Sequence, residues 1–483
     1  MATTRKPQSV QQPITSLIIC FILWKILLLA VAWIGPGSGY DTSSTLLLAR
    51  EGAGSDPNGG CPSFTTRLMS WDAIYFVSIA KTGYLYEQEW AFGWGYTNLL
   101  SSISKELNLT PGSIATYVWT GVAVSHVSHL LAVILLYLLA RKLTPEGVED
   151  HSAFVAAALH IVSPAGIILS APYGEALYSL LSFAGTLLFV HAMCAFHGRQ
   201  TLYQDSIIVI AGALFGFATT VRSNGIFNGA MIAFEFASQL INLPWNLSSL
   251  VLWRKIVALG LAGLLTAAGF VVPQMIAFYD ICLDRPRVSW PRPWCGASLF
   301  PSVYTWVQDY YWGVGFFRYW NMSNLPLFVL SAPILWLLFT SAADSLMRVL
   351  HFSNRQAPPP RPVQSKENLA SQNKSEHQSE TSHALKTMVT AKLAIPQLII
   401  AILALTNFHV QSIIRVSSGY PLWYVWLASE LLQQKSDTIP EKSVGDTIVA
   451  RRNSLFRHHI VVRGIITYAI VHAGLWSSFL PPA

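Results

Sequence analysis

Eleven long apolar runs constrain this chain more than any other feature of its sequence. The first, residues 14–34, is about as long as a helix must be to cross a bilayer core of about 30 Å. Only 11 % of all residues are charged, against about 25 % in soluble domains. We therefore expect an all-α polytopic membrane protein with about eleven transmembrane helices, and we exclude a soluble enzyme, a disordered chain and an outer-membrane barrel. The other runs are 113–140, 152–171, 175–197, 206–222, 225–243, 256–279, 326–347, 389–409, 416–433 and 459–479.

The first run follows the basic residues Arg5 and Lys6. It is longer than a typical signal-peptide core, which indicates a signal anchor. A cleaved signal peptide is the alternative, because Ala30-Val31-Ala32 is similar to a cleavage site. Lys25 lies inside the run, so its ammonium group must reach the interface or face protein.

The basic residues predict the orientation of the chain. With the N-terminus in the cytosol, 18 of the 31 Lys and Arg residues fall in cytosolic segments and 10 on the luminal side, over longer loops. This arrangement puts the C-terminus in the lumen and accounts for the net charge of +7 without a nucleic-acid partner. The expected regions are a signal anchor and first transmembrane helix (1–34), a first luminal loop (35–112), a transmembrane core with a luminal loop at 280–325 (113–352), a disordered cytosolic linker (353–388) and C-terminal transmembrane helices (389–483).

The first luminal loop contains an amphipathic segment, Phe64–Lys81. Within it Leu68, Trp71, Tyr75 and Ile79 recur at spacings of three and four residues. This pattern predicts a helix that lies in the membrane interface.

Asp72 stands out within this segment. An acid beside a membrane-seated aromatic helix is costly unless it has a partner or a catalytic role. We therefore predict that Asp72 is a general base that accepts a proton from a sugar hydroxyl. The alternatives are a helix cap and a salt bridge to Arg67.

Other polar groups are expected at membrane depth on the luminal side. Their basic members could hold a lipid phosphate, and the alternative for each is an ion pair that stabilises a helix end. These groups are Tyr173, Glu175, Arg222, Asn224, Arg318, His409, Gln411 and Arg415.

The cysteine and histidine spacings do not predict a metal site, and the sequence contains no nucleotide-binding glycine motif. Cys61, Cys282 and Cys295 fall in loops. If those loops face an oxidising lumen, one disulfide can form, and Cys282 with Cys295 is the nearest pair.

Several short motifs together resemble the PIG-V family of GPI mannosyltransferases. They occur in the family's order over roughly residues 70–425, and they are specific only as a set. The motifs are Trp71-Asp72-Ala73, Gly83-Tyr84-Leu85-Tyr86-Glu87, Ala91-Phe92, Ser163-Pro164-Ala165, Tyr173-Gly174-Glu175-Ala176-Leu177, Val221-Arg222-Ser223-Asn224-Gly225, Arg292-Pro293-Trp294-Cys295, Trp312-Gly313-Val314-Gly315-Phe316-Phe317-Arg318-Tyr319-Trp320 and His409-Val410-Gln411.

The resemblance implies a GT-C glycosyltransferase in the endoplasmic reticulum membrane. Its donor would be dolichyl-phosphate-mannose and its acceptor a GPI-anchor precursor. It would add the second mannose in α-1,6 linkage, with inversion at the anomeric carbon. Asp72 matches the family's catalytic acid, and the chemistry requires neither a cofactor nor a metal. The resemblance leaves open a small accessory membrane subunit. It adds candidate substrate-binding residues in the first loop, namely Trp71, Tyr86, Glu87 and Glu89. Glu87 and Glu89 could either accept hydrogen bonds from sugar hydroxyls or support the residues that bind the substrates.

Two other functions fit the same sequence. One is a different lipid-linked or protein mannosyltransferase of the same architecture, since the acceptor contacts are not visible in the sequence. The other is a lipid transporter, which would call for paired broken helices in related halves.

Overall fold

The computed structural model describes most of the chain. The described residues are 12–35, 42–50, 63–107, 112–144, 149–194, 201–284, 292–296, 301–355, 383–436 and 445–478. Helices, turns and irregular segments make up this described part, and it contains no β-strand. The predicted linker at 353–388 lies mainly outside the described residues.

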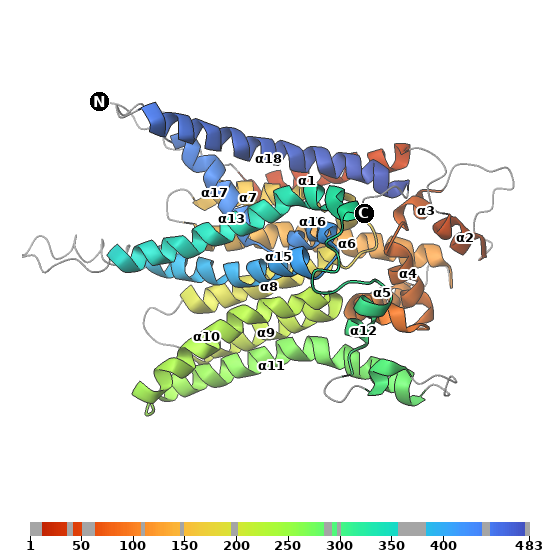
Figure 1. Cartoon of the computed structure of the whole chain (residues 1–483), viewed down its shortest axis with the longest axis horizontal. Coiled ribbons are helices and arrows are strands. Elements are labelled where there is room, and N and C mark those ends of the chain that lie inside the picture. The colour runs from red at the N-terminus through yellow and green to blue at the C-terminus, as the bar shows by residue number, and fades with distance from the viewer. Residues whose placement is uncertain are drawn as a thin grey trace, which may run out of the picture.

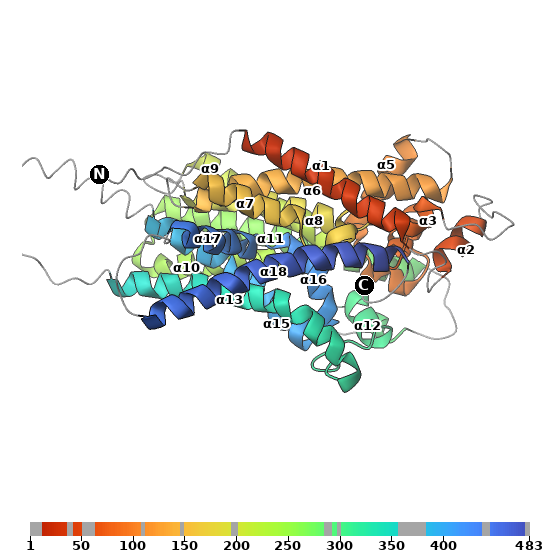
Figure 2. The ribbon, with the colours of Figure 1, turned by 90° about the horizontal axis from the view of Figure 1, so that it is seen from above.

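Long helices run side by side along the long axis of the molecule (Figures 1 and 2). This architecture confirms the all-α prediction. The helices are α1 (Pro13–Ile34), α6 (Ile114–Leu143), α7 (Glu149–Ile161), α8 (Glu175–Cys194), α9 (Leu202–Val221), α10 (Gly229–Asn242), α11 (Leu250–Phe278), α13 (Leu325–Arg355), α15 (Ala394–Thr406), α17 (Leu422–Ser436) and α18 (Gly445–Ser477).

Nine helices in the described part are long and apolar enough to cross a membrane, so the predicted count of eleven is not confirmed. The two remaining runs, 152–171 and 416–433, form the shorter helices α7 and α17. A proline limits the length of each of these two helices, because its backbone nitrogen cannot donate a helical hydrogen bond. Pro164 follows the end of α7, and Pro421 precedes α17.

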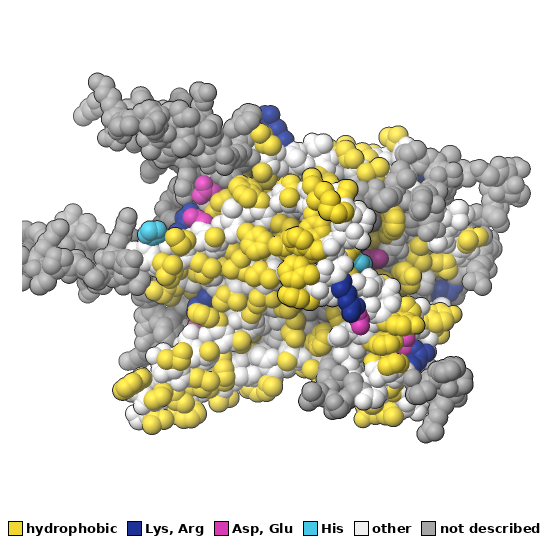
Figure 3. Space-filling view, in the orientation of Figure 1, with side chains coloured by type: hydrophobic (Ala, Val, Ile, Leu, Met, Phe, Trp, Pro, Cys, Tyr) yellow, Lys and Arg dark blue, Asp and Glu magenta, His cyan; other side chains and the backbone are white. Residues whose placement is uncertain are grey.

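The outer surface of the bundle suits a lipid environment. Hydrophobic side chains cover much of the face in Figure 3, and the visible charges lie mostly toward its two ends. On α1 and α11, large apolar side chains such as Leu23 and Leu264 are 62 % and 69 % exposed. A contiguous exposed apolar surface of this kind is typical of lipid-facing helices.

Short helices gather at one end of the bundle (Figure 1). The first loop and the segment after α11 therefore lie on the same side, as the predicted orientation requires. The first-loop elements are α2 (Ser43–Arg50), α3 (Phe64–Leu68), α4 (Ala73–Thr82), the 3₁₀ helix η1 (Glu87–Ala91) and α5 (Trp94–Leu107); α12 (Val303–Tyr310) follows α11.

The prediction of one helix over Phe64–Lys81 is wrong. The structure has two helices there, α3 and α4, because α3 ends at Leu68 and Trp71 takes a left-handed φ of 57°. This conformation interrupts a right-handed helix. The apolar spacing continues through the break, so the pattern alone did not reveal it.

Lys25 faces protein, one of the two placements expected for it. Its ammonium group is buried and donates to the Leu169 carbonyl at 2.8 Å and to Ser170 Oγ at 2.7 Å. These acceptors lie at the end of the 3₁₀ helix η2 (Gly166–Leu169), which leads to Tyr173 and Glu175. The first helix is therefore bound into the core of the molecule.

Candidate active site

Asp72 lies at the break between α3 and α4, on the wall of a cavity. The preceding residue, Trp71, has the positive φ described above, which costs about 1–2 kcal/mol for a residue with a Cβ. Non-glycine residues held in this conformation cluster at functional sites. The local backbone thus supports a role for Asp72 beyond packing.

The cavity beside Asp72 has a volume of about 370 Å³. The first loop, the turn between α9 and the 3₁₀ helix η3 (Ser223–Asn228), and helices α11, α12, α15 and α16 (Ile413–Val416) contribute to its wall. One part of the wall is polar and another is apolar. The polar residues are Asp72, Arg222, Ser223, Asn224, Tyr304, Thr305, Gln308, His409, Ser412 and Arg415; the apolar ones include Ile226, Phe227, Phe270, Ile400, Ala404 and Phe408.

Asp72 forms an ion pair with Arg415, 343 positions further along the chain. Arg415 Nη1 donates to Asp72 Oδ2 at 2.6 Å, and the Asp72 side chain remains 32 % exposed. The Asp72 side chain makes no helix-cap hydrogen bond. Arg67, the other partner considered, donates to the carbonyls of Ala32 and Gly35 at 3.2 and 2.7 Å. In the structure Asp72 therefore has Arg415 as its charged partner, and it lines a cavity.

Glu175 lies behind this pair and is almost fully buried. Its Oε1 is 3.2 Å from Arg222 Nη1 and 3.6 Å from Arg415 Nε. A buried carboxylate is tolerated when cations compensate its charge, so Glu175 positions both arginines along one wall. Burial alone would lower the pKa of Arg415, but the carboxylates of Asp72 and Glu175 raise it above its ordinary value. Arg415 is a permanent cation here.

Tyr173 supports the same group. Its hydroxyl donates to the Ser70 carbonyl at 3.3 Å, and its ring faces the Arg415 guanidinium, with 6.0 Å between the guanidinium carbon and the ring centroid. The buried ring therefore ties the turn before Asp72 to the arginine that pairs with it. Tyr173 does not itself line the cavity.

His409 and Asn224 also lie on the cavity wall. The ring of His409 packs on Tyr319, with centroids 4.9 Å apart, and burial lowers its pKa. A neutral imidazole can donate and accept hydrogen bonds, as a sugar requires. Asn224 Nδ2 donates to the Tyr420 hydroxyl at 3.3 Å, and Gln411 Oε1 accepts from the Tyr319 hydroxyl at 3.1 Å.

Eight residues suggested by the sequence do not line the cavity. Trp71, Tyr173, Glu175 and Gln411 contact or directly adjoin residues that do, and the other four are Arg318, Tyr86, Glu89 and Glu87. Arg318 pairs with Asp309, and both side chains are more than half exposed. Tyr86 is exposed, and Glu89 Oε2 accepts from the backbone amides of Leu85 and Tyr86 at 2.6 and 2.9 Å. Glu87 is bound by side chains from the region around α12.

Sequence reasoning did not find the residues that α12 contributes. Tyr304, Thr305 and Gln308 line the cavity. The available signal was Ser302, whose hydroxyl accepts from the Thr305 amide and starts α12. A serine before a short amphipathic segment predicts such a helix, but it does not reveal that the helix returns to Asp72.

The structure confirms the disulfide between Cys282 and Cys295. Among the described residues there is no group of three or more His, Cys, Asp or Glu side chains that could hold a metal ion.

The chain is similar to known proteins over nearly its whole length. The family model described as "Mannosyltransferase (PIG-V)" matches residues 14–483. The GPI mannosyltransferase 2 of Aspergillus oryzae is 38 % identical over 98 % of this chain and 96 % of the relative. That of Aspergillus fumigatus is also 38 % identical, over 98 % and 94 %, and that of Yarrowia lipolytica is 31 % identical over 97 % and 99 %.

Solved structures give a weaker likeness. The oligosaccharyltransferase AglB of Archaeoglobus fulgidus matches with a TM-score of 0.45 and 15 % identity, over 96 % of this chain and 56 % of that one. The family assignment rests instead on the sequence matches, which span nearly the whole of both chains. The chain belongs to the PIG-V mannosyltransferase family.

Proposed function

We propose that this chain adds the second mannose of a GPI-anchor precursor, in α-1,6 linkage, from dolichyl-phosphate-mannose at the luminal face of the endoplasmic reticulum membrane. The observation that carries the proposal is that Asp72, Arg222 and Arg415 share one cavity wall. A glycosyl transfer from a lipid phosphate needs these groups together: a base for the acceptor and cations for the leaving phosphate. The names of the related proteins supply the acceptor class.

Asp72 acts as the base in this proposal. Its carboxylate takes the proton of the acceptor 6-hydroxyl while that oxygen attacks the anomeric carbon of mannose. The bond from that carbon to the phosphate oxygen breaks, and dolichyl phosphate leaves. One in-line displacement converts the β-linked donor into an α-linked product.

The structure separates the three arginines that the sequence left unranked. Arg222 and Arg415 line the cavity, whereas Arg318 pairs with Asp309 outside it. We therefore assign the donor phosphate to Arg222 and Arg415. Before the donor binds, Arg415 holds the Asp72 carboxylate; the phosphate then shares this guanidinium and leaves Asp72 available to the acceptor.

The apolar part of the cavity wall fits the lipid portion of the donor. Phe270 of α11 and Ile400 and Ala404 of α15 lie on the same cavity as the arginines. A polyprenyl chain packed there keeps its phosphate at the polar end. This arrangement favours a transferase with a lipid-linked donor.

The test is mannose transfer from dolichyl-phosphate-mannose to a monomannosylated GPI precursor, with wild type and Asp72→Asn purified side by side. We expect the substitution to lower the rate about 10²- to 10⁴-fold, as loss of a general base does, while the protein still accumulates in the membrane. Asp309→Asn is the matched control, because Asp309 lies in the exposed pair with Arg318. Full activity of Asp72→Asn would refute the assigned base, and transfer only to other acceptors would refute the assigned reaction.

A further inference from the structure

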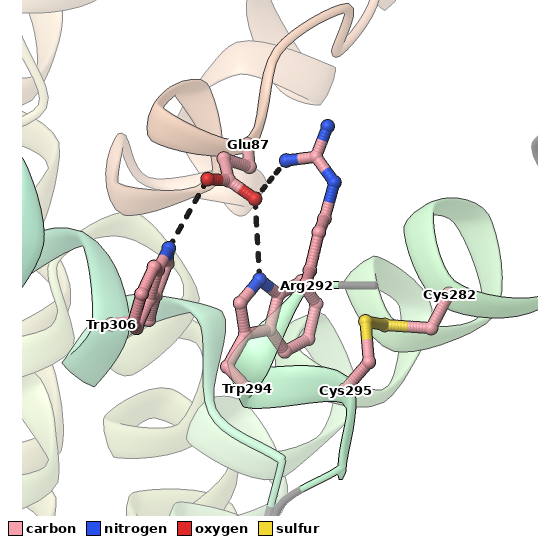
Figure 4. The surroundings of a disulfide bond; sticks show 6 residues. All are labelled: Glu87, Cys282, Arg292, Trp294, Cys295 and Trp306. Carbon is pink, nitrogen blue, oxygen red and sulfur yellow. Dashed lines mark hydrogen bonds and ion pairs between the residues drawn. A yellow bond between two sulfur atoms is a disulfide. The ribbon is translucent and has the colours of Figure 1, made fainter. Parts of the chain in front are cut away.

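Glu87 belongs to the first loop, yet its carboxylate is bound by side chains 205 to 224 positions further along the chain. Oε2 accepts from the Arg292 guanidinium and from Trp294 Nε1 at 3.2 Å (Figure 4). Oε1 accepts from Trp306 Nε1 at 3.1 Å and from the Tyr311 hydroxyl at 2.8 Å. The Glu87 side chain is only 7 % exposed, so protein groups satisfy it almost completely.

The charge on Glu87 is stabilised in this position. Burial alone would raise the pKa of Glu87, but the hydrogen bonds from Tyr311 and Arg292 lower it below its usual range. The carboxylate is therefore ionised and committed to these donors at neutral pH. The surroundings of Asp72 are different, because its side chain is one-third exposed on the cavity wall.

An apolar cluster and a disulfide reinforce the same contact. The Cys282–Cys295 bond joins the residue after Trp294 to the π-helix η5 (Tyr279–Asp284), which continues α11 (Figure 4). The first loop, the end of α11 and α12 are thus held together at several points. The buried residues of this cluster are Trp90, Ala277, Ile281, Trp294, Val303 and Val307.

We call the Glu87 carboxylate and its donors Arg292, Trp294, Trp306 and Tyr311 the Glu87 clamp. Helix α12 connects this clamp to the cavity. Trp306 binds Glu87, and Val303 and Val307 lie in the apolar cluster, while Tyr304 and Gln308 line the cavity with Asp72. Residues one position apart on a helix point in different directions, so one short helix can serve both. Any shift of α12 against the first loop therefore moves the hydroxyl of Tyr304 and the amide of Gln308 relative to Asp72.

We propose that Glu87 is a positioning residue: its carboxylate fixes α12 as a wall of the cavity and thereby sets how tightly the substrates are held beside Asp72. Glu87 touches neither the substrates nor the reacting atoms. Tyr304, Thr305 and Gln308 supply the polar contacts to the sugars, and the disulfide keeps the Trp294 segment in place. This inference rests on the function proposed above.

Steady-state kinetics of Glu87→Gln test the proposal. The amide keeps the shape of the side chain but loses the charge that binds Arg292. We expect KM for the donor, the acceptor or both to rise about tenfold, with kcat changed much less, because small misplacements of binding groups cost about this much or more. Glu106→Gln is the control, since Glu106 is an exposed acid of α5 in the same loop.

A second readout needs no substrate. In a variant with Cys20, Cys61 and Cys194 replaced by serine, only Cys282 and Cys295 can be alkylated after mild reduction. Glu87→Gln should speed this reduction and labelling severalfold, because the Trp294 segment loses its anchor. The control Glu106→Gln should label at the original rate.

The kinetic and labelling results together test the role of Glu87 separately from the proposed reaction. Unchanged KM values with unchanged labelling overturn the proposal, and so does a fall in kcat alone with unchanged labelling, which would make Glu87 a catalytic residue. Raised KM values with faster labelling support it. If wild type transfers no mannose to the GPI precursor, the proposed function fails, and the labelling rate still decides whether Glu87 holds the clamp. Unchanged labelling then overturns the clamp as well.

Discussion

At the scale of single residues, the net charge in and around the cavity is the same before and after the proposed transfer. Asp72, Glu175, Arg222 and Arg415 sum to zero, and a donor phosphodiester adds one negative charge. After transfer Asp72 carries a proton, and the dolichyl phosphate has gained the charge that Asp72 lost. The site therefore meets both states with the same two cations, which lowers the electrostatic cost of the step.

Arg415 is the residue on which this balance depends most. We expect Arg415→Gln to lower kcat about hundredfold, since the leaving phosphate loses one fixed cation. Asp72 also loses the partner at 2.6 Å that positions its carboxylate. The measurement is the rate of mannose transfer at saturating donor and acceptor.

Arg318→Gln is the matched control for this substitution. Its pair with Asp309 is more than half exposed, and such surface pairs contribute little. The control should retain nearly full activity. Equal losses in the two variants would show that the cavity arginine has no special part in the reaction.

At the scale of elements, the first loop must approach α9 closely for the site to form. A Cβ added at Gly93 would overlap the carbonyl oxygen of Val221, and one at Gly95 would overlap Thr220 Oγ1. Val221 precedes Arg222, so this contact sets the distance between the first loop and one of the two cavity arginines. Only glycine allows the two backbones to lie so close.

Gly93→Ala should therefore destabilise the protein by about 1–3 kcal/mol and reduce transfer, because the added methyl group forces the loop away from α9. Thermal unfolding in detergent and the transfer assay measure the two effects. Gly263→Ala is the control, since its Cβ would meet no atom within 4 Å and alanine favours the helix of α11. If both variants behave as wild type, the close approach does not matter for the site.

Helices with a regular apolar pattern were predictable from the sequence, whereas the break within one of them and the contacts between distant segments were not. Each apolar run contains a helix, because the tendency of a segment to form an apolar helix that packs on protein or faces lipid depends on its local composition. The break before Asp72 escaped prediction, because the left-handed Trp71 leaves the apolar spacing intact. Asp72 was identifiable as an unusual acid. Its partner Arg415 and the Glu87 clamp depend on packing between distant segments, which no local pattern encodes.

At the scale of the whole molecule, the first and last helices both support the back of the site. Lys25 of α1 binds the end of η2. Trp476 of α18 is fully buried and packs on Tyr173, with ring centroids 6.1 Å apart. Helices α1 and α18 also contact each other, and in Figure 2 they converge toward the end of the bundle that carries the short first-loop helices. Removal of α1 as a cleaved signal would take Lys25 from this core, so the arrangement favours a retained signal anchor.

The directions of these two helices predict where the chain ends lie. Both α1 and α18 begin at the end of the bundle opposite the short first-loop helices and run toward them (Figures 1 and 2). An epitope before α1 and one after α18 should therefore lie on opposite sides of the membrane, with the basic end cytosolic. In cells whose plasma membrane alone is permeabilised, we expect antibody to reach the N-terminal epitope but not the C-terminal one. An epitope inserted after Arg355 controls for access, because α13 ends on the predicted cytosolic side. Detection of the C-terminal epitope under these conditions would contradict the orientation, and loss of the N-terminal epitope from the mature protein would show that α1 is cleaved.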